Sequence, residues 1–163
     1  MDSANGIAVG GGAVAGVLST VAYVHHDLSL KWGESASTLT VAASSVEDAA
    51  ARASTDPGAV DRGSGFFPPK ASTWTRIADD IEHGSNDMLG KIGPNPYRMP
   101  AVAPLRRAGT MSIEAGISEL RSAATHATAL EASSLHSSKL AMITAGAVAV
   151  TAGAAWLGSK LFS

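Results

Sequence analysis

The feature that most constrains this chain is a run of twenty residues without a charged side chain, Leu140 to Ser159, between Lys139 and Lys160. A helix rises ~1.5 Å per residue, so a helix of this length covers the ~30 Å hydrocarbon layer of a bilayer. A helix also satisfies its own backbone hydrogen bonds, as lipid requires. The run therefore predicts a membrane-spanning helix over 140–159.

A second uncharged run covers the twenty-two residues of 3–24 and contains five glycines. Each glycine costs a helix in water ~1 kcal/mol relative to alanine. In lipid, glycine is well tolerated where two helices meet. We expect a second transmembrane helix over 3–24, with a glycine-rich soluble loop as the alternative.

Small side chains recur along one face of each run. In the first run they follow alternating steps of four and three, and in the second run they follow steps of four. This spacing lets the backbone approach another helix while bulkier residues face lipid. We therefore expect helix-packing surfaces, against each other or against other subunits, at Ala8, Gly12, Ala15, Ser19, Ala22, Ala141, Ala145, Ala149 and Gly153.

The segment 25–109 is predicted to lie outside the membrane. Gly33 is expected to interrupt the first helix, and a capping box of Ser44 and Glu47 predicts a short helix near 45–54. A second short helix is predicted over 73–83, where apolar residues repeat at helical spacing, and Gly84 is suited to end it.

Two further elements follow. Four prolines and two glycines between Ser85 and Arg107 predict an extended, proline-rich strand over 85–107. From residue 111 onward the helical period returns without a proline, which predicts one long helix over 111–161 that contains the second span.

The middle segment lacks an evident core of its own. One face of the 73–83 helix carries Trp74, Ile77 and Ile81, and the proline-rich segment carries Tyr97. A helix of about three turns is not stable alone. We expect these four side chains to dock on a partner subunit.

Catalytic and metal-binding patterns are missing from the sequence. There is no cysteine, no G-x-S-x-G motif, and the carboxylates Asp79, Asp80 and Glu82 are typical of a solvated helix face. The net charge of −2 and the lack of a basic cluster argue against nucleic acid as a partner. We expect a protein that is not an enzyme and has neither a metal site nor a small-molecule substrate.

Three histidines border the two runs: His25, His26 and His136. Imidazole at these positions is able to ligate a haem or a chlorophyll. Such a cofactor also requires bulky apolar walls, whereas these helices offer alanine and glycine. Histidines at the membrane interface are the favoured interpretation, and a haem- or chlorophyll-binding subunit is an alternative.

Together these patterns predict an all-α membrane protein with two small-residue-rich transmembrane helices, joined by a partly helical, partly extended segment. The expected function is that of a non-catalytic accessory subunit in a large complex, with other membrane subunits and the lipid bilayer as partners. The expected setting is the mitochondrial inner membrane, or the thylakoid. A self-associating, membrane-shaping protein is the main alternative.

Overall fold

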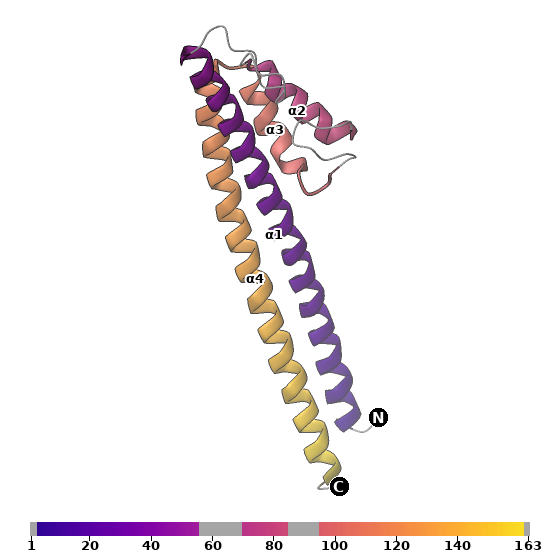
Figure 1. The fold of residues 1–163 in the computed structure, drawn as a ribbon. Coiled ribbons are helices and arrows are strands. Elements are labelled where there is room, and N and C mark those ends of the chain that lie inside the picture. Colours follow the sequence, from indigo (N-terminus) through magenta and orange to yellow (C-terminus); the bar gives the residue numbers. More distant parts are fainter. Residues whose placement is uncertain (1–2, 56–69, 85–94, 162–163) are drawn as a thin grey trace. The chain divides into compact units, whose positions relative to one another are not determined.

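A computed structural model describes residues 3–55, 70–84 and 95–161, and every regular element in these ranges is a helix. The elements are α1 (Ser3–Thr55), α2 (Ser72–His83), α3 (Met99–Ala108) and α4 (Ile113–Leu161) (Figure 1). α1 and α4 each contain a stretch that is long and apolar enough to cross a membrane.

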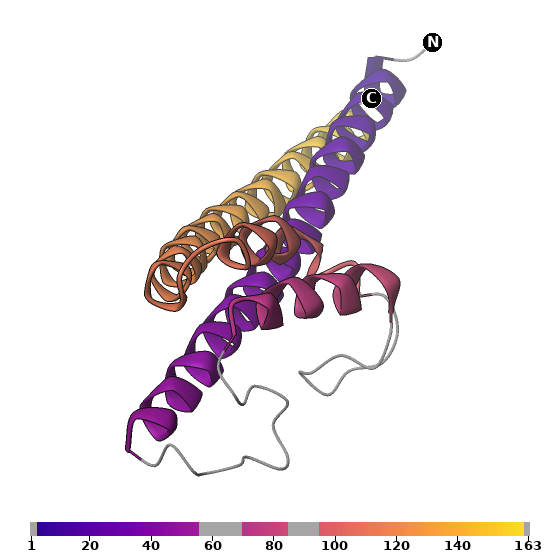
Figure 2. The same ribbon diagram turned by 90° about the horizontal axis from the view of Figure 1, so that it is seen from above.

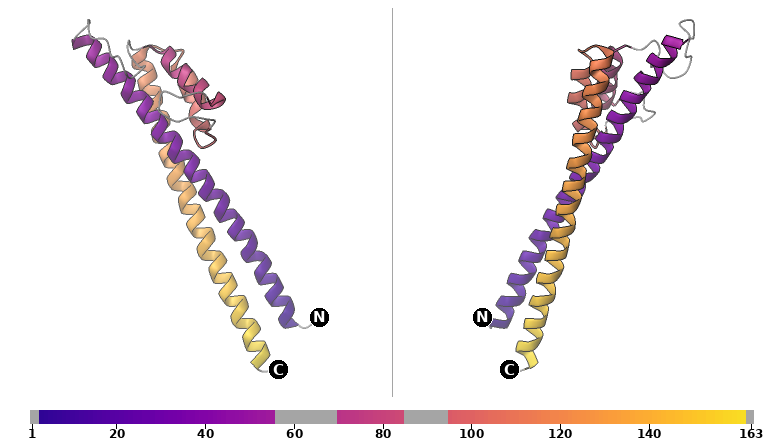
Figure 3. Two further views of the ribbon diagram at one scale, coloured as in Figure 1. Left: turned by 45° about the vertical axis from the view of Figure 1, so that its right-hand side comes forward. Right: turned by 90° about the vertical axis from the view of Figure 1, so that its left-hand side faces the viewer.

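The chain forms two compact units, which we describe separately. Unit 1 comprises Met1–Ser29 and Ala132–Ser163, and unit 2 comprises Leu30–Glu131. Within unit 1 the two helices run antiparallel, with the first residues of α1 and the last residues of α4 at the same end of the pair (Figure 3).

α1 does not break where the sequence suggested. The predicted interruption at Gly33 and the separate helix near 45–54 are wrong, because α1 continues to Thr55. One glycine costs a helix interior only ~1 kcal/mol, and Leu39 and Val46 on the same helix are buried in the core of unit 2. A Cβ at Gly33 would lie 2.8 Å from the Glu131 carboxylate, so glycine also makes room there.

α2 covers the range in which the sequence placed a helix. Gly84 ends it with a φ of 70°, in the left-handed region that favours glycine, and its N–H donates to the carbonyl of Asp80 at 2.9 Å. α2 packs against α3, which runs beside it (Figure 2).

α3 replaces part of the predicted extended strand. Of the range 85–107, residues 85–94 lie outside the described residues, and the strand is wrong from Met99 onward, where α3 begins. Pro100 occupies the first turn, where a helix needs no N–H. Pro104 lies inside the helix and removes one backbone bond. The burial of Val102 and Leu105 outweighs this loss.

All four helices contribute to the core of unit 2. Its largest fully buried side chains come from α1, α2, α3 and α4: Leu39, Val46, Trp74, Ile77, Ile81, Leu105 and Leu120. Alanines at the helix contacts, such as Ala42 and Ala108, let the backbones approach around these larger groups. The middle of the chain therefore has a core of its own, contrary to the expectation from its composition.

Candidate functional site

The two helices of unit 1 meet along a face of small residues. On α1 the contact face follows steps of three and four, through Ala8, Gly11, Ala15, Leu18 and Ala22. On α4 it passes through Ala141, Ala145, Val148 and Ala152. The Ser138 hydroxyl adds a cross-helix hydrogen bond, donating to the Ala22 carbonyl at 2.8 Å. Alternating steps of three and four keep one face of a helix against its neighbour over several turns.

Five of the nine predicted packing residues lie in this contact and four do not. Ala8, Ala15, Ala22, Ala141 and Ala145 are partly or fully buried, whereas the exposed residues are Gly12, Ser19, Ala149 and Gly153. On α4 the predicted residues follow steps of four only. Each such step overshoots a full turn by ~40°, so the later residues of this series rotate away from the contact. On α1, Gly12 and Ser19 lie one residue beyond Gly11 and Leu18, which face α4.

Three of the four exposed small residues line a surface groove. A groove of about 270 Å³ in unit 1 is lined by Ala8, Gly12, Ala149 and Gly153, together with Ala152 and Trp156. The structure therefore brings four predicted residues together from the two helices, but on the outside of the pair. Apart from the chain neighbours and the nearby backbone of the same helix, no heavy atom lies within 4 Å of a Cβ placed on Gly12 or Gly153.

Large apolar side chains cover the outside of the same helix pair. Val9, Val17, Ile143 and Val150 are 65–73% exposed. Only 6% of the most apolar stretch of α1 and 11% of that of α4 are buried within the chain. Neither stretch is therefore a core helix of this chain, since core helices bury their apolar residues.

The three histidines considered as cofactor ligands all lie in unit 1. His26 and His136 are exposed, and His25 is partly buried, with no hydrogen-bond partner for its Nδ1 among the described residues. In the described part of the chain, the three rings do not form a group whose ligating atoms lie within 4.8 Å of one another.

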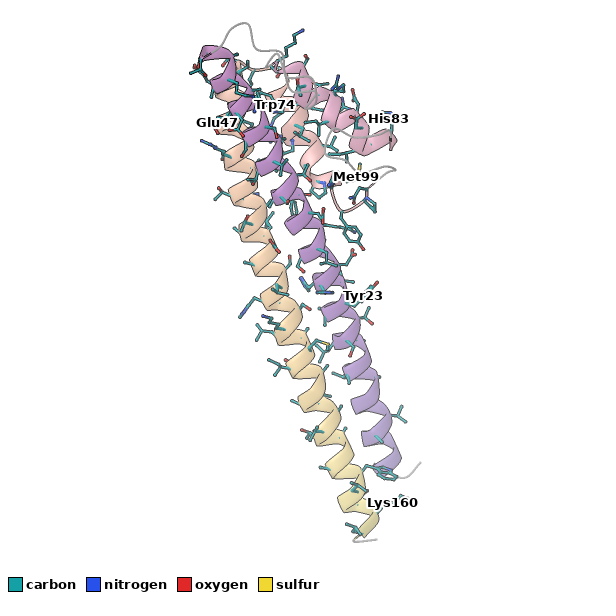
Figure 4. The ribbon with its side chains drawn as sticks, in the orientation of Figure 1. Tyr23, Glu47, Trp74, His83, Met99 and Lys160 are labelled. Atoms are coloured by element: carbon teal, nitrogen blue, oxygen red, sulfur yellow. The ribbon has the colours of Figure 1, made fainter. Side chains whose placement is uncertain are left out.

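The side chains predicted to dock on a partner are instead buried in unit 2 itself. Trp74 and Ile77 are 0% exposed and Ile81 is 1% exposed. The Trp74 Nε1 donates to the Ala42 carbonyl at 3.1 Å, and Figure 4 shows Trp74 between α2 and α1. Tyr97 remains 36% exposed. The partner-docking prediction is thus corrected for the three α2 residues, because α1, α3 and α4 supply the surface that α2 lacks.

The carboxylates of α2 are not merely solvated. Arg106 on α3 forms ion pairs with Asp79, at 2.8 Å, and with Glu82. The hydrogen bond that Arg106 donates to Glu82 and the charges of both carboxylates raise the pKa of Arg106. Asp79, Glu82 and His83 lie close enough to share a cation. Arg106 already pairs with both carboxylates, and the His83 ring contacts the Asp79 carbonyl at 2.9 Å, so we assign no metal to them.

Unit 2 also contains a cleft of about 310 Å³ between α1, α3 and α4. Its lining combines apolar walls with an ion pair and a histidine: Trp32, Ser35, Leu39, Pro100, Pro104, Arg107, Glu119, Ser122, Ala123, His126 and Ala127. The sequence patterns did not reveal this cleft, because its residues come from three helices and recur in no local motif.

The chemistry of these residues is the basis for any functional interpretation. No protein-family model, no curated protein and no solved structure matches the chain.

Proposed function

We propose that this chain is a non-catalytic subunit of a membrane complex, anchored by residues 3–24 of α1 and 140–159 of α4, with unit 2 outside the bilayer. The observation that carries the proposal is the arrangement of side chains in unit 1. The contact between its two helices consists mainly of small residues, and most of its large apolar residues face outward. In water this arrangement leaves the apolar surface exposed at a high cost. In lipid it has no such cost, and small residues let the two backbones pack closely.

Partner subunits are the second part of the proposal. The groove lined by Gly12 and Gly153 offers a face on which a further transmembrane helix has room to approach. An energy-transducing complex of the mitochondrial inner membrane or the thylakoid is the setting we propose, on the basis of the small-residue spans alone.

The membrane anchor is tested by alkaline carbonate extraction of membranes that contain the tagged full chain. We expect the chain to remain in the lipid pellet. Val150→Asp places a charge in the middle of the α4 run, which costs ~2.5–3.5 kcal/mol for insertion, and we expect it to increase release. Ala129→Asp, at an exposed position of α4 in unit 2, is the matched control and should behave as wild type. Release of the wild-type chain into the supernatant would show that it does not span.

A self-associating membrane protein is the second candidate, favoured by the open faces around Gly12 and Gly16, where added atoms meet nothing within 4 Å. Two copies with different tags, expressed together and solubilised gently, separate the two candidates. A complex of unlike chains without co-purification of the second tag supports the accessory subunit. Co-purification of both tags without other chains supports self-association.

A further inference from the structure

The cleft of unit 2 has the size and lining of a small-molecule site. Its volume of about 310 Å³ lies at the lower end of the ~300–1,000 Å³ in which proteins hold organic ligands. Trp32, Leu39 and Pro104 form apolar walls, and Arg107, Glu119 and His126 supply polar groups. Trp32 is only partly buried, so its indole is accessible to a ring that stacks on it.

The charges of the cleft are already balanced. Arg107 donates to Oε1 of Glu119 from Nε at 2.9 Å, and its Nη2 lies 2.8 Å from the same oxygen in an ion pair. A charged ligand would have to compete with this ion pair for one of its members. An uncharged ligand leaves the pair intact and avoids that cost.

The polar groups also include more donors than the ion pair uses. A guanidinium has five N–H groups, and the hydrogen bond to Glu119 uses the one on Nε of Arg107. The Arg107 side chain is 56% exposed, so its remaining N–H groups are accessible. The His126 ring is exposed as well and offers a further N–H. A ligand that accepts hydrogen bonds therefore fits better than one that only donates them.

We propose that this cleft binds a small, uncharged, planar ring compound that carries carbonyl oxygens, the chemical class to which quinones belong. The ring packs against Trp32 and Pro104, and the carbonyl oxygens accept hydrogen bonds from Arg107 and His126. The inference goes beyond the proposed membrane role and does not depend on it, because every lining residue lies between Trp32 and Ala127, within unit 2.

The test uses the purified full chain in detergent micelles and two probes of the same shape. Duroquinone carries two carbonyl oxygens, and durene is the corresponding hydrocarbon ring without them. The chain has no cysteine, so no thiol captures the quinone covalently. Saturation-transfer NMR and equilibrium dialysis should show one saturable site for duroquinone. Durene should bind at least about tenfold more weakly, because the hydrogen bond to the charged Arg107 alone contributes about this factor and the bond to His126 is lost as well.

Matched substitutions on α4 show whether the cleft is the site. Ala123→Leu and Ser122→Leu both add bulk to the cleft and should abolish saturable binding, whereas Ala129→Leu, exposed and outside the cleft, should leave it unchanged. Ser122 is itself exposed, so its variant keeps the test valid if Ala123→Leu fails to fold by circular dichroism. Non-saturable uptake, equal affinity for durene, or binding retained by a folded cleft variant would overturn the proposal.

Discussion

Gly11 in unit 1 and Gly116 in unit 2 both lie where a neighbouring residue leaves no space for a side chain, but the neighbouring group differs. In unit 1, a Cβ on Gly11 would overlap with the Cβ and approach the backbone of Ala152 on the neighbouring helix. In unit 2, a Cβ on Gly116 would overlap with the indole ring of Trp74. Gly11 thus allows a backbone to approach, and Gly116 makes room for the largest side chain of the core.

The comparison shows how each unit is stabilised. In unit 2, bulky side chains are buried and ion pairs such as Arg121–Glu47 lie on the surface, which is the arrangement that the hydrophobic effect favours in water. In unit 1, bulky side chains point outward and the contact between α1 and α4 consists mainly of alanine and glycine. Such a contact depends on close packing and cross-helix hydrogen bonds, the forces available in lipid.

Trp74→Ala should have the largest effect, and it should destabilise unit 2 while leaving unit 1 unchanged. Removing a buried tryptophan typically costs ~3–5 kcal/mol, and Trp74 touches the core from α2. Amide hydrogen exchange of the full chain should show loss of protection in α2 and α3, with residues 140–159 of α4 unchanged. Trp156→Ala, at a residue 37% exposed in unit 1, is the control and should leave α2 protected. Unchanged protection of α2 in the Trp74 variant would contradict the core described for unit 2.

Gly11→Ala and Gly116→Ala should have intermediate effects, each in its own unit. Overpacking typically costs ~1–3 kcal/mol, so Gly11→Ala should lower the SDS midpoint of unit 1 in mixed micelles, and Gly116→Ala should reduce the protection of α2. Gly12→Ala is the control, because its new Cβ meets nothing within 4 Å. Since alanine favours a helix by ~1 kcal/mol over glycine, this variant should be neutral or stabilising. A greater loss of stability in the Gly12 variant than in the Gly11 variant would mean that Gly12, and not Gly11, lies in the contact with α4.

The smallest effects should come from two serines that donate to a backbone carbonyl of another element. Ser138 donates to Ala22 in unit 1, and Ser35 donates to Tyr97 in unit 2, at 3.1 Å. Ser138→Ala should cost ~0.6 kcal/mol, the average for such bonds between membrane helices, and Ser35→Ala ~1 kcal/mol. Unfolding midpoints and amide exchange measure both. The Ser159 hydroxyl donates to the Trp156 carbonyl of its own helix, so Ser159→Ala should change neither the unfolding midpoint nor the amide exchange. An equal loss of stability in this variant would mean that the hydrogen bonds between elements contribute no more than one within a helix.

The elements that depend on local patterns could be predicted from the amino-acid sequence. The uncharged run 140–159 lies within α4, and the apolar period of 73–83 coincides with α2, which Gly84 caps. Hydropathy, helical periodicity and the left-handed preference of glycine act over a few residues, so the sequence displays them directly. The small-residue character of the α1 and α4 contact was equally visible.

Which of these residues contact one another depends on how the helices pack. Trp74 is buried against Ala42 and Gly116, which are far from it in the sequence. The sequence showed an apolar side chain that had to be buried, but not that the same chain would bury it. α1 continues through Gly33, and α3 tolerates Pro104. Glycine and proline each lower helix stability locally, and the sequence shows this cost, but it does not show the core burial that outweighs it. Gly11 and Gly12 are identical neighbouring residues, so the sequence does not distinguish them. They point ~100° apart around the helix axis, and in the structure it is Gly11 that faces Ala152.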